Sequence, residues 1–290
     1  MDASLSYFHP DVAAWFTENL GEPTLAQRQG WPEIARGRSM LLSAPTGSGK
    51  TLAAFLYAIN GFYEQKQTDH VQGGLSVLYL SPLRSLANDM YQNLQRPLRG
   101  LGLESGVSIA VRNSDTPSGE RSKMLKKPPN ILLTTPESLF VLLTSKNGRN
   151  ALRTVKTVIV DELHAVLGTK RGTHLTLSLE RLENLCGHPL QRIGLSATVK
   201  PIERAAAYLA GYSGGKPRDV AVVAPVSEKR IDVRVVSPIQ DMRALPEGTI
   251  WPEIFRTVYN MAKESRTTLA FLNSRAPCEK LANGINELYG

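Results

Sequence analysis

Short runs of apolar, often β-branched residues alternate along the chain with longer segments in which apolar residues recur every three or four positions. The short runs suit buried strands, and the longer segments have the period of amphipathic helices. We expect strands at residues 40–43, 77–80, 108–112, 131–134, 157–160, 193–195 and 220–223. We expect helices between them at residues 50–64, 85–94, 119–126, 138–143, 175–184 and 202–209. This alternation predicts an α/β protein whose parallel sheet is covered by helices on both faces.

The same pattern predicts how the rest of the chain is organised. Two helix patterns, 12–20 and 25–36, precede the first expected strand. Prolines and a glycine interrupt the pattern between residues 225 and 250, namely Pro225, Pro238, Pro246 and Gly248. The further elements expected there and beyond are a strand at 231–236, a helix at 251–262, a strand at 268–272 and a helix from Arg275.

These elements suggest four parts. The tail of about 40 residues is too short to bury an α/β core of its own. The expected division is N-terminal helices at 1–38, a sheet domain at 39–226, a linker at 227–248 and the start of a second domain at 249–290.

Composition excludes only a few classes of protein function. The 290 residues are 42% hydrophobic and 21% charged, as in an ordinary globular protein. A net charge of +8 favours a polyanionic partner weakly. Cys186 and Cys278 lack metal-ligand spacing, and the five histidines are scattered, which favours reduced thiols. Without an N-terminal leader pattern or a long apolar run, a cytoplasmic protein is expected.

The segment Ala44-Pro-Thr-Gly-Ser-Gly-Lys-Thr51, between the first expected strand and its helix, carries the strongest chemical signal. Its glycines let successive backbone N–H groups point at phosphate oxygens, with the helix dipole behind them. Lys50 is expected to reach the β- and γ-phosphates, and the Thr51 hydroxyl to bind Mg²⁺. The strict pattern opens with Gly where Ala44 stands. The predicted nucleotide-binding residues are Thr46, Gly47, Ser48, Gly49, Lys50 and Thr51.

A pair of acids, Asp161 and Glu162, directly follows the strand expected at 157–160. In open α/β sheets, ligands bind at the carboxyl ends of the strands. Asp161 is expected to hold Mg²⁺, and Glu162 to orient and deprotonate an attacking water. Two acids at a strand end are more often only solvated, so the prediction rests on the phosphate loop upstream. Ser196-Ala197-Thr198, after another strand, offers hydroxyls that could relay a hydrogen bond from the acids.

The order and spacing of these elements resemble the superfamily 2 helicases. The matching segments are Pro23–Gln27 (the Q motif), Ala44–Thr51 (motif I), Ser81–Ala87 (Ia), Thr134–Leu139 (Ib), Asp161–His164 (motif II, as DExH) and Ser196–Thr198 (motif III). In this family the Ala at the first position of motif I is usual. The resemblance implies a RecA-like fold, ATP and Mg²⁺ as cofactors, adenine recognition by Gln27, and coupling through His164, Ser196 and Thr198.

Longer strings resemble the large helicase-related (Lhr) group of DNA helicases within this superfamily. They are His9-Pro10, Trp15-Phe16, Arg28–Pro32, Lys170–Gly172, Leu177–Leu182 and Arg192–Val199. Relatives tend to carry Thr-Gly-Asp-Thr-Pro where this chain has Asn113-Ser-Asp-Thr-Pro117. The missing Gly removes a backbone position that tolerates positive φ.

The resemblance also implies a single-stranded nucleic acid partner, DNA rather than RNA, gripped through its sugar-phosphate backbone. Such contacts carry little sequence information and are salt-sensitive. The candidate residues are Arg84, Thr135, Pro136, Glu137 and Ser138, followed by Arg112, Lys170 and Arg171. Trp15, Trp31 and Trp251 could stack on bases, but their helical spacing favours packing roles.

The last residues, Thr267 to Arg275, resemble the opening strand and motif IV of a second RecA-like domain. Motifs V and VI do not follow, and motif VI normally supplies an arginine worth about 10³ to 10⁵ in rate. We therefore expect the N-terminal part of an ATP-dependent helicase or translocase, with its C-terminal domains missing and little turnover alone. The alternative is a non-catalytic, nucleotide-gated nucleic-acid binding module. A P-loop kinase or a transporter ATPase would not explain Pro23–Gln27 together with Ser196–Thr198.

Overall fold

The computed structural model describes residues 2–68, 71–226, 232–239 and 249–289. The chain forms two compact units, Met1–Glu228 and Lys229–Gly290. The first unit carries the sheet, and the second contributes two helices. Each unit is described by itself below.

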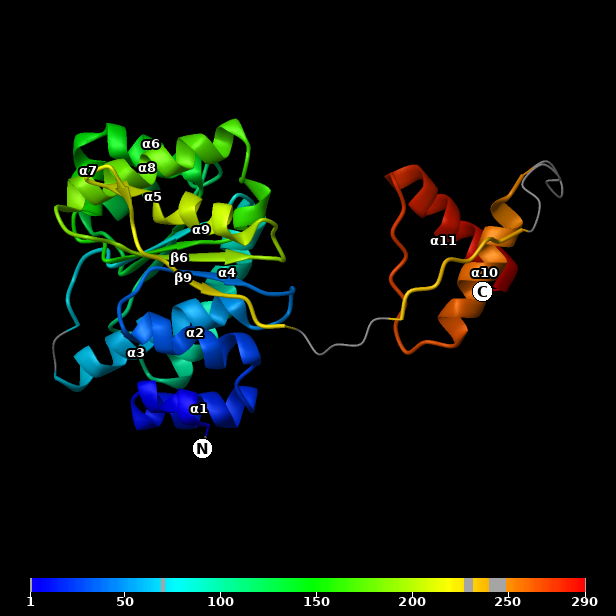
Figure 1. Ribbon diagram of the computed structural model, residues 1–290, viewed down its shortest axis with the longest axis horizontal. Helices are drawn as coiled ribbons and strands as arrows, with labels where there is room; N and C mark the ends of the chain where they lie inside the picture. Colours follow the sequence, from blue (N-terminus) through cyan, green and yellow to red (C-terminus); the bar gives the residue numbers. More distant parts are fainter. Residues whose placement is uncertain (1, 69–70, 227–231, 240–248, 290) are drawn as a thin grey trace. The chain divides into compact units, whose positions relative to one another are not determined.

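The first unit is built on a sheet whose paired strands all run parallel (Figure 1). Its order is β3-β4-β2-β5-β6-β1-β9. The strands are β1 (Met40–Ser43), β2 (Val77–Leu80), β3 (Ile109–Arg112), β4 (Ile131–Thr134), β5 (Thr157–Val160), β6 (Gln191–Ser196) and β9 (Ala221–Val223). All seven expected strands are present, with ends shifted by up to two residues. The predicted parallel α/β fold is confirmed.

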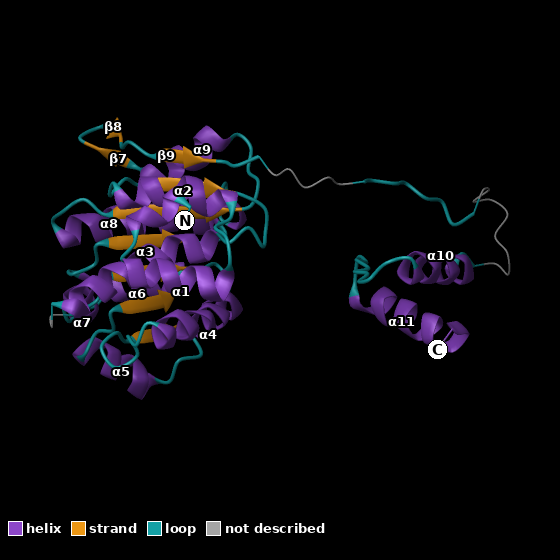
Figure 2. Cartoon of the chain, turned by 90° about the horizontal axis from the view of Figure 1, so that it is seen from below, coloured by secondary structure: helices purple, strands orange, loops and turns teal. Residues whose placement is uncertain are grey.

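Helices cover both faces of this sheet (Figures 1 and 2). One face carries α1 (Pro10–Leu20), α2 (Leu25–Ala35), α3 (Lys50–Gln67) and α4 (Arg84–Gly100). The other face carries α5 (Ser118–Lys126), α6 (Pro136–Thr144), α7 (Lys146–Leu152), α8 (Lys170–Cys186) and α9 (Ile202–Ala210). The pattern did not predict α7, the short 3-10 helices η1 (Ala3–Tyr7) and η2 (Leu163–Ala165), or the antiparallel pair β7 (Tyr212–Ser213) and β8 (Lys216–Pro217).

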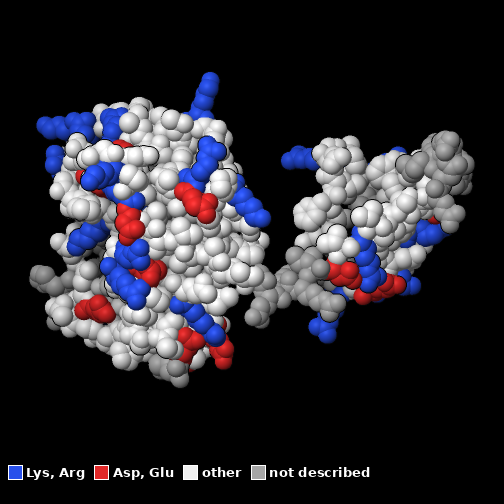
Figure 3. All heavy atoms as spheres, in the orientation of Figure 1, with Lys and Arg blue, Asp and Glu red and all other residues white. Residues whose placement is uncertain are grey.

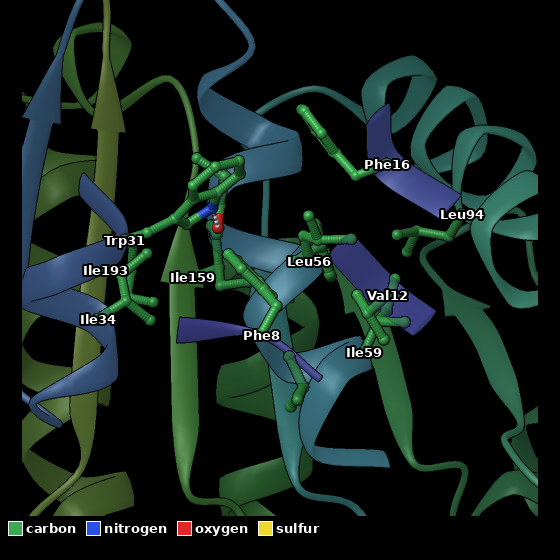
Figure 4. Close-up of a cluster of buried hydrophobic side chains, with 14 of the residues drawn as sticks. Phe8, Val12, Phe16, Trp31, Ile34, Leu56, Ile59, Leu94, Ile159 and Ile193 are labelled. Atoms are coloured by element: carbon green, nitrogen blue, oxygen red, sulfur yellow. Dashed lines mark hydrogen bonds between the residues drawn. The ribbon is translucent and has the colours of Figure 1, made fainter. Parts of the chain in front are cut away.

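The N-terminal helices are part of the same core (Figure 4). Trp31 of α2 is fully buried, and its ring lies edge-to-face against Phe8 at 4.8 Å and Phe16 at 5.4 Å. Its indole Nε1 donates a hydrogen bond of 3.2 Å to the carbonyl of Ala53 in α3. Trp15 is also buried. Both tryptophans are therefore packing residues, and neither is an exposed stacking platform.

Parallel pairing places the carboxyl ends of the strands at one edge of the sheet. The phosphate loop follows β1, the Asp161–Glu162 pair follows β5, and Ala197 follows β6. The segments that resemble motifs Ia and Ib follow β2 and β4 in the same way. Backbone hydrogen bonds tie two of these ends together, because the Ala44 N–H donates to the Ser196 carbonyl at 3.1 Å. The topology thus brings segments more than 150 residues apart to one edge of the sheet.

The second unit contains α10 (Trp251–Lys263) and α11 (Arg275–Tyr289). The Phe255 ring packs so closely on Gly284 that a Cβ there would lie 2.3 Å from it. The strand expected at 268–272 is absent, and Leu269 and Phe271 are exposed. Residues 232–236 are not a strand either, and residue 231 lies outside the described part. A strand is stable only when a neighbouring strand takes up its hydrogen bonds, and the described part of this unit offers none.

A candidate nucleotide and nucleic-acid site

The phosphate loop has the backbone curvature that the sequence predicts. Gly47 and Gly49 have φ of 78° and 77°, a left-handed conformation that glycine adopts without the Cβ penalty of other residues. The Nζ of Lys50, the first residue of α3, donates hydrogen bonds to the carbonyls of Ala44 (2.6 Å) and Pro45 (2.7 Å). Burial lowers the pKa of this ammonium, while the charges of Glu162 and Asp161 oppose the shift.

The segment that resembles the Q motif is joined directly to the phosphate loop. Thr24 and Gln27 form a capping box at the start of α2, in which the Thr24 N–H donates to Gln27 Oε1 at 2.8 Å. The Thr24 hydroxyl donates to the Ser48 carbonyl at 2.7 Å, and Gln27 Nε2 donates to the Gly49 carbonyl at 3.4 Å. A Cβ on Gly49 would lie 2.6 Å from Gln27 Nε2. Gln27 is therefore placed against the loop, with both ends of its amide hydrogen-bonded.

Asp161 is held between two donors just beyond β5. The phenol of Tyr79, on the neighbouring strand β2, donates to its Oδ2 at 2.7 Å, and the Glu162 N–H donates to its Oδ1 at 2.8 Å. Burial and the Asp161 charge raise the Tyr79 pKa, so the phenol remains a donor. The pattern analysis missed Tyr79, although one tyrosine among the aliphatic residues of a buried strand was a signal that a polar partner was needed.

Glu162 is the non-glycine residue with positive φ (48°) in the part of the chain that the structure describes. Such a conformation costs about 1–2 kcal/mol for a residue with a Cβ. Strain of this kind often accompanies functional sites, where surrounding contacts hold it. Here it turns the chain sharply after β5, so that successive acids take different directions: Asp161 is buried, while Glu162 is half exposed.

His164 connects the acidic loop to the end of β6. The Ala197 N–H donates to His164 Nδ1 at 3.3 Å, which makes Nδ1 an acceptor. The Ser196 Oγ, at 3.4 Å, and Glu162 Oε2, at 3.3 Å, lie near the same nitrogen. Ser196 and His164 are thus brought together. Thr198 is exposed, and its side chain makes no hydrogen bond with a described residue.

The site has features that suit a nucleotide and Mg²⁺. The Ser48 hydroxyl, inside the phosphate loop, is buried without a hydrogen-bond partner among the described residues. A cavity of about 430 Å³ adjoins the loop: Gly47, Lys50 and Thr51 line it together with residues of α1 and α4, while Asp161 and Glu162 are not in its lining. The described residues contain no cluster of three or more acids, histidines or cysteines that could hold a metal alone. Mg²⁺ commonly uses one or two carboxylates plus phosphates and waters, so Asp161 and Thr51 fit that ion.

A groove of about 830 Å³ lies at the same edge, beyond β2, β3 and β4. Four of the five principal residues predicted to bind nucleic acid line it, namely Arg84, Thr135, Glu137 and Ser138. The fifth, Pro136, is buried in the first turn of α6. The groove's other lining residues are Pro82, Leu83, Ser85, Arg112, Asn113, Ser114, Arg121, Val141 and Arg171.

Most charged groups in this groove are paired. Arg171 forms two hydrogen bonds with the Glu137 carboxylate, one of them from Nη2 to Oε2 at 3.0 Å. Burial raises the Glu137 pKa, but its hydrogen bonds, with that from Arg171 the largest, and the Arg171 charge together outweigh burial and lower the pKa overall. Arg84 donates to Asp115 at 2.8 Å. Ser114, where relatives tend to have glycine, adopts an ordinary negative φ.

Charge alone does not mark the site. In Figure 3, basic side chains are scattered over the drawn face with acidic ones among them. The arrangement of individual side chains, and not a broad basic surface, distinguishes the sheet edge. No helix in the described part of the chain is long and apolar enough to cross a membrane.

Comparison with known proteins also points to the helicases. The DEAD/DEAH box helicase profile matches residues 24–205. The chain is 44% identical to an "Lhr helicase/probable uracil glycosylase" of Mycolicibacterium smegmatis, over 98% of this chain and 19% of that protein. It is 42% identical to an "ATP-dependent helicase Lhr-Core" of Methanothermobacter thermautotrophicus, over 98% of this chain and 34% of that one.

A solved structure is similar over nearly the whole chain. It is that of the Mycobacterium smegmatis helicase Lhr bound to ssDNA and AMP-PNP, with a TM-score of 0.82 and 42% identity. The match covers 99% of this chain and 36% of that protein. The chain therefore spans about a fifth to a third of the length of the curated relatives described above.

Proposed function

The chain belongs to the DEAD/DEAH box helicase family, and from this premise we propose that it binds ATP–Mg²⁺ and single-stranded nucleic acid as part of an ATP-dependent helicase or translocase. The observation that carries the proposal is the meeting of the phosphate loop, Asp161 and Glu162 at one sheet edge. Burial lowers the pKa of Lys50 and the charges of Glu162 and Asp161 oppose that shift, which supports a shared site for a triphosphate and its metal ion.

Each side chain has a role in this proposal. The loop N–H groups and Lys50 bind the β- and γ-phosphates. Thr51 and Asp161 would hold Mg²⁺, which supplies charge neutralisation when bound. Glu162, half exposed beside His164, orients a water and accepts its proton. Gln27, which is hydrogen-bonded to the Gly49 carbonyl, is proposed to recognise the adenine edge. His164 and Ser196 connect this centre to β6.

DNA is the proposed nucleic acid. The similar helicase of Mycobacterium smegmatis was solved with ssDNA, and the groove beyond β2, β3 and β4 offers hydroxyls and arginines suited to a sugar-phosphate backbone. Arg84, Thr135 and Ser138 are the proposed contacts, and Glu137 positions Arg171 through their ion pair. We expect little ATP turnover from the 290 residues by themselves.

Calorimetric titration with Mg²⁺–AMP-PNP tests the nucleotide site. Lys50→Ala should abolish measurable binding, because the ammonium is the principal cation expected on the phosphates. Lys123→Ala, on the exposed side of α5, is the matched control and should bind as the wild type does. Unchanged affinity of the Lys50 variant would show that the phosphate-loop assignment is wrong.

Turnover separates the motor from a non-catalytic binding module. Phosphate release is measured in the presence of ssDNA. If Glu162→Gln abolishes this release while AMP-PNP still binds, the water-orienting role belongs to Glu162. The alternative, a non-catalytic binding module, would be favoured by a different result. In that case ssDNA binding would depend on the nucleotide, but neither this chain nor a longer one would release phosphate in a Glu162-dependent way.

A further inference from the structure

Arg112 differs from the other arginines of the groove. It is the last residue of β3, only 8% of its surface is exposed, and its Nη1 is buried without a hydrogen-bond partner. Among the described residues, its guanidinium donates no hydrogen bond and no carboxylate lies within 4 Å of it. A buried charge is costly unless a counter-charge or several acceptors meet it.

Its neighbours do not compensate for this charge. Arg121 lies close enough to lower the Arg112 pKa, as burial does more strongly. The Arg121 guanidinium is itself used by the loop after β3, because its Nε donates to the Thr116 carbonyl at 2.6 Å and its Nη2 to the Ser114 carbonyl at 2.7 Å. Of these two groove-lining guanidinium groups, Arg121 is therefore hydrogen-bonded and Arg112 is not, and no carboxylate of a described residue lies within 4 Å of Arg112.

The surroundings of Arg112 would suit an apolar side chain for stability alone. Besides the groove, the residue lines a small cavity with Met124, Leu125 and Leu132. An aliphatic residue of similar length would fill that place without a desolvation penalty. Since the charge adds no ion pair to the fold, a ligand that enters the groove is the natural partner for it.

We propose that Arg112 forms a buried phosphate seat in this groove, which binds one phosphodiester of the single strand through two parallel hydrogen bonds. A planar guanidinium matches two phosphate oxygens at once, which an ammonium does not. Thr135 and Ser138 line the same groove and offer hydroxyls to the adjoining backbone. Arg84 and Arg171 are neutralised by ion pairs with Asp115 and Glu137. The positive charge of Arg112 is therefore the least compensated of the three.

This inference rests on the proposed function, since it names a binding residue for the same strand. The resemblance names Arg112 only as a secondary candidate for nucleic-acid binding, and it lies outside the segments that resemble motifs Ia and Ib; the inference adds the buried, uncompensated guanidinium and the single phosphodiester that it binds. Arg121 has a positioning role: it holds the carbonyls of residues 114 and 116, so the loop after β3 keeps its shape beside the seat.

The test measures the affinity of the 290-residue chain for fluorescent oligo-dT, with Mg²⁺–AMP-PNP present, over a series of KCl concentrations. Loss of one phosphate contact should reduce the steepness of log K against log salt by about 0.7 for a single strand. Arg112→Met, which keeps length and removes charge, should show that reduction and bind about tenfold more weakly. Arg112→Lys should keep the slope and bind with intermediate affinity.

Arg149→Gln is the charge-matched control, because that exposed arginine of α7 does not line the groove. It should keep the wild-type slope. Thermal unfolding of the free proteins separates binding from structure: Arg112→Met should melt at the wild-type temperature or higher, whereas removal of a structural arginine would lower it. If Arg112→Met does not fold, the lysine variant decides, and wild-type affinity in that variant would overturn the proposal.

Two further results would also count against the seat. An unchanged salt slope in Arg112→Met, with ssDNA bound normally by the wild type, overturns this inference and leaves the proposed function standing. No ssDNA binding by the wild type contradicts the proposed function itself. A last measurement uses inorganic phosphate. If phosphate raises the melting temperature of the wild type but not of Arg112→Met, and both proteins show the same slope of log K against log salt with ssDNA, then the seat binds a free phosphate and not the strand.

Discussion

A buried tyrosine decides how the metal-binding carboxylate of the proposed site is presented. Tyr79 lies on β2 and Asp161 follows β5, and the two strands are neighbours in the sheet. The 2.7 Å hydrogen bond from the phenol fixes Oδ2, while the next backbone N–H fixes Oδ1. Asp161 keeps one direction as a result, and its remaining lone pairs are available to Mg²⁺ or its waters.

Tyr79→Phe removes this hydrogen bond with little change of shape. Because the acceptor is a carboxylate, we expect about 1.5–3 kcal/mol lower free energy of unfolding, together with weaker binding of Mg²⁺–AMP-PNP. Tyr208→Phe is the matched control, since its phenol donates to the Gly172 carbonyl at 2.6 Å, away from Asp161. Urea unfolding and calorimetry measure the two quantities. Equal nucleotide affinity in both variants would refute the positioning role.

The pH dependence of stability provides a second readout for the same variant. Burial raises the pKa of Tyr79 and of Tyr208. A group whose pKa is raised on folding stabilises the protein fully below its unfolded pKa, about 10 for tyrosine, and progressively less as the pH rises beyond it. The free energy of unfolding should therefore fall above about pH 10, less steeply in Tyr79→Phe than in the wild type.

At the scale of elements, a cluster of ion pairs fastens β6 to α8. Arg192 of β6 is 1% exposed and pairs with Glu180 and Glu183 of α8, each at 2.9 Å. Arg218 joins the same two carboxylates. Burial raises the Glu180 pKa, but hydrogen bonds with the two arginines outweigh it and lower the pKa overall. Since β6 ends at Ser196, this cluster supports the strand that meets His164.

Glu183→Gln should weaken that cluster. Arg192 would remain buried with one carboxylate fewer, and we expect about 1.5–3 kcal/mol lower free energy of unfolding by urea titration at neutral pH. Glu203→Gln, exposed on α9, is the control with the same change of charge. The role assigned to the cluster would be wrong if both variants lost the same small amount.

At the scale of the whole molecule, the sheet unit holds all the elements of the proposed site. The two apolar clusters, one on each face of the sheet, are built from residues between Leu5 and Val223. The N-terminal helices belong to the first of them, so they are a fixed part of the sheet unit. Phosphate loop, acids and groove lie in this unit as well.

A chain that ends at Glu228 should therefore fold cooperatively and bind Mg²⁺–AMP-PNP as the 290-residue chain does. Both cores remain complete in it, and no residue assigned to the nucleotide lies beyond that point. Calorimetric melting and titration of the two chains make the comparison. A broad, non-cooperative melt of the shorter chain would mean that residues after 228 stabilise the sheet unit.

The sequence by itself determined the seven strands of the sheet and the parallel α/β class, and it located the candidate phosphate loop and acidic pair, because each depends on local periodicity or on a contiguous motif. Tertiary structure alone decided the partners of these residues. Tyr79 meets Asp161 only because β2 and β5 pair, and Arg112 finds no counter-charge among the described residues only because of what packs around it. The strand expected at 268–272 shows the same limit, since a strand forms only where another segment accepts its hydrogen bonds.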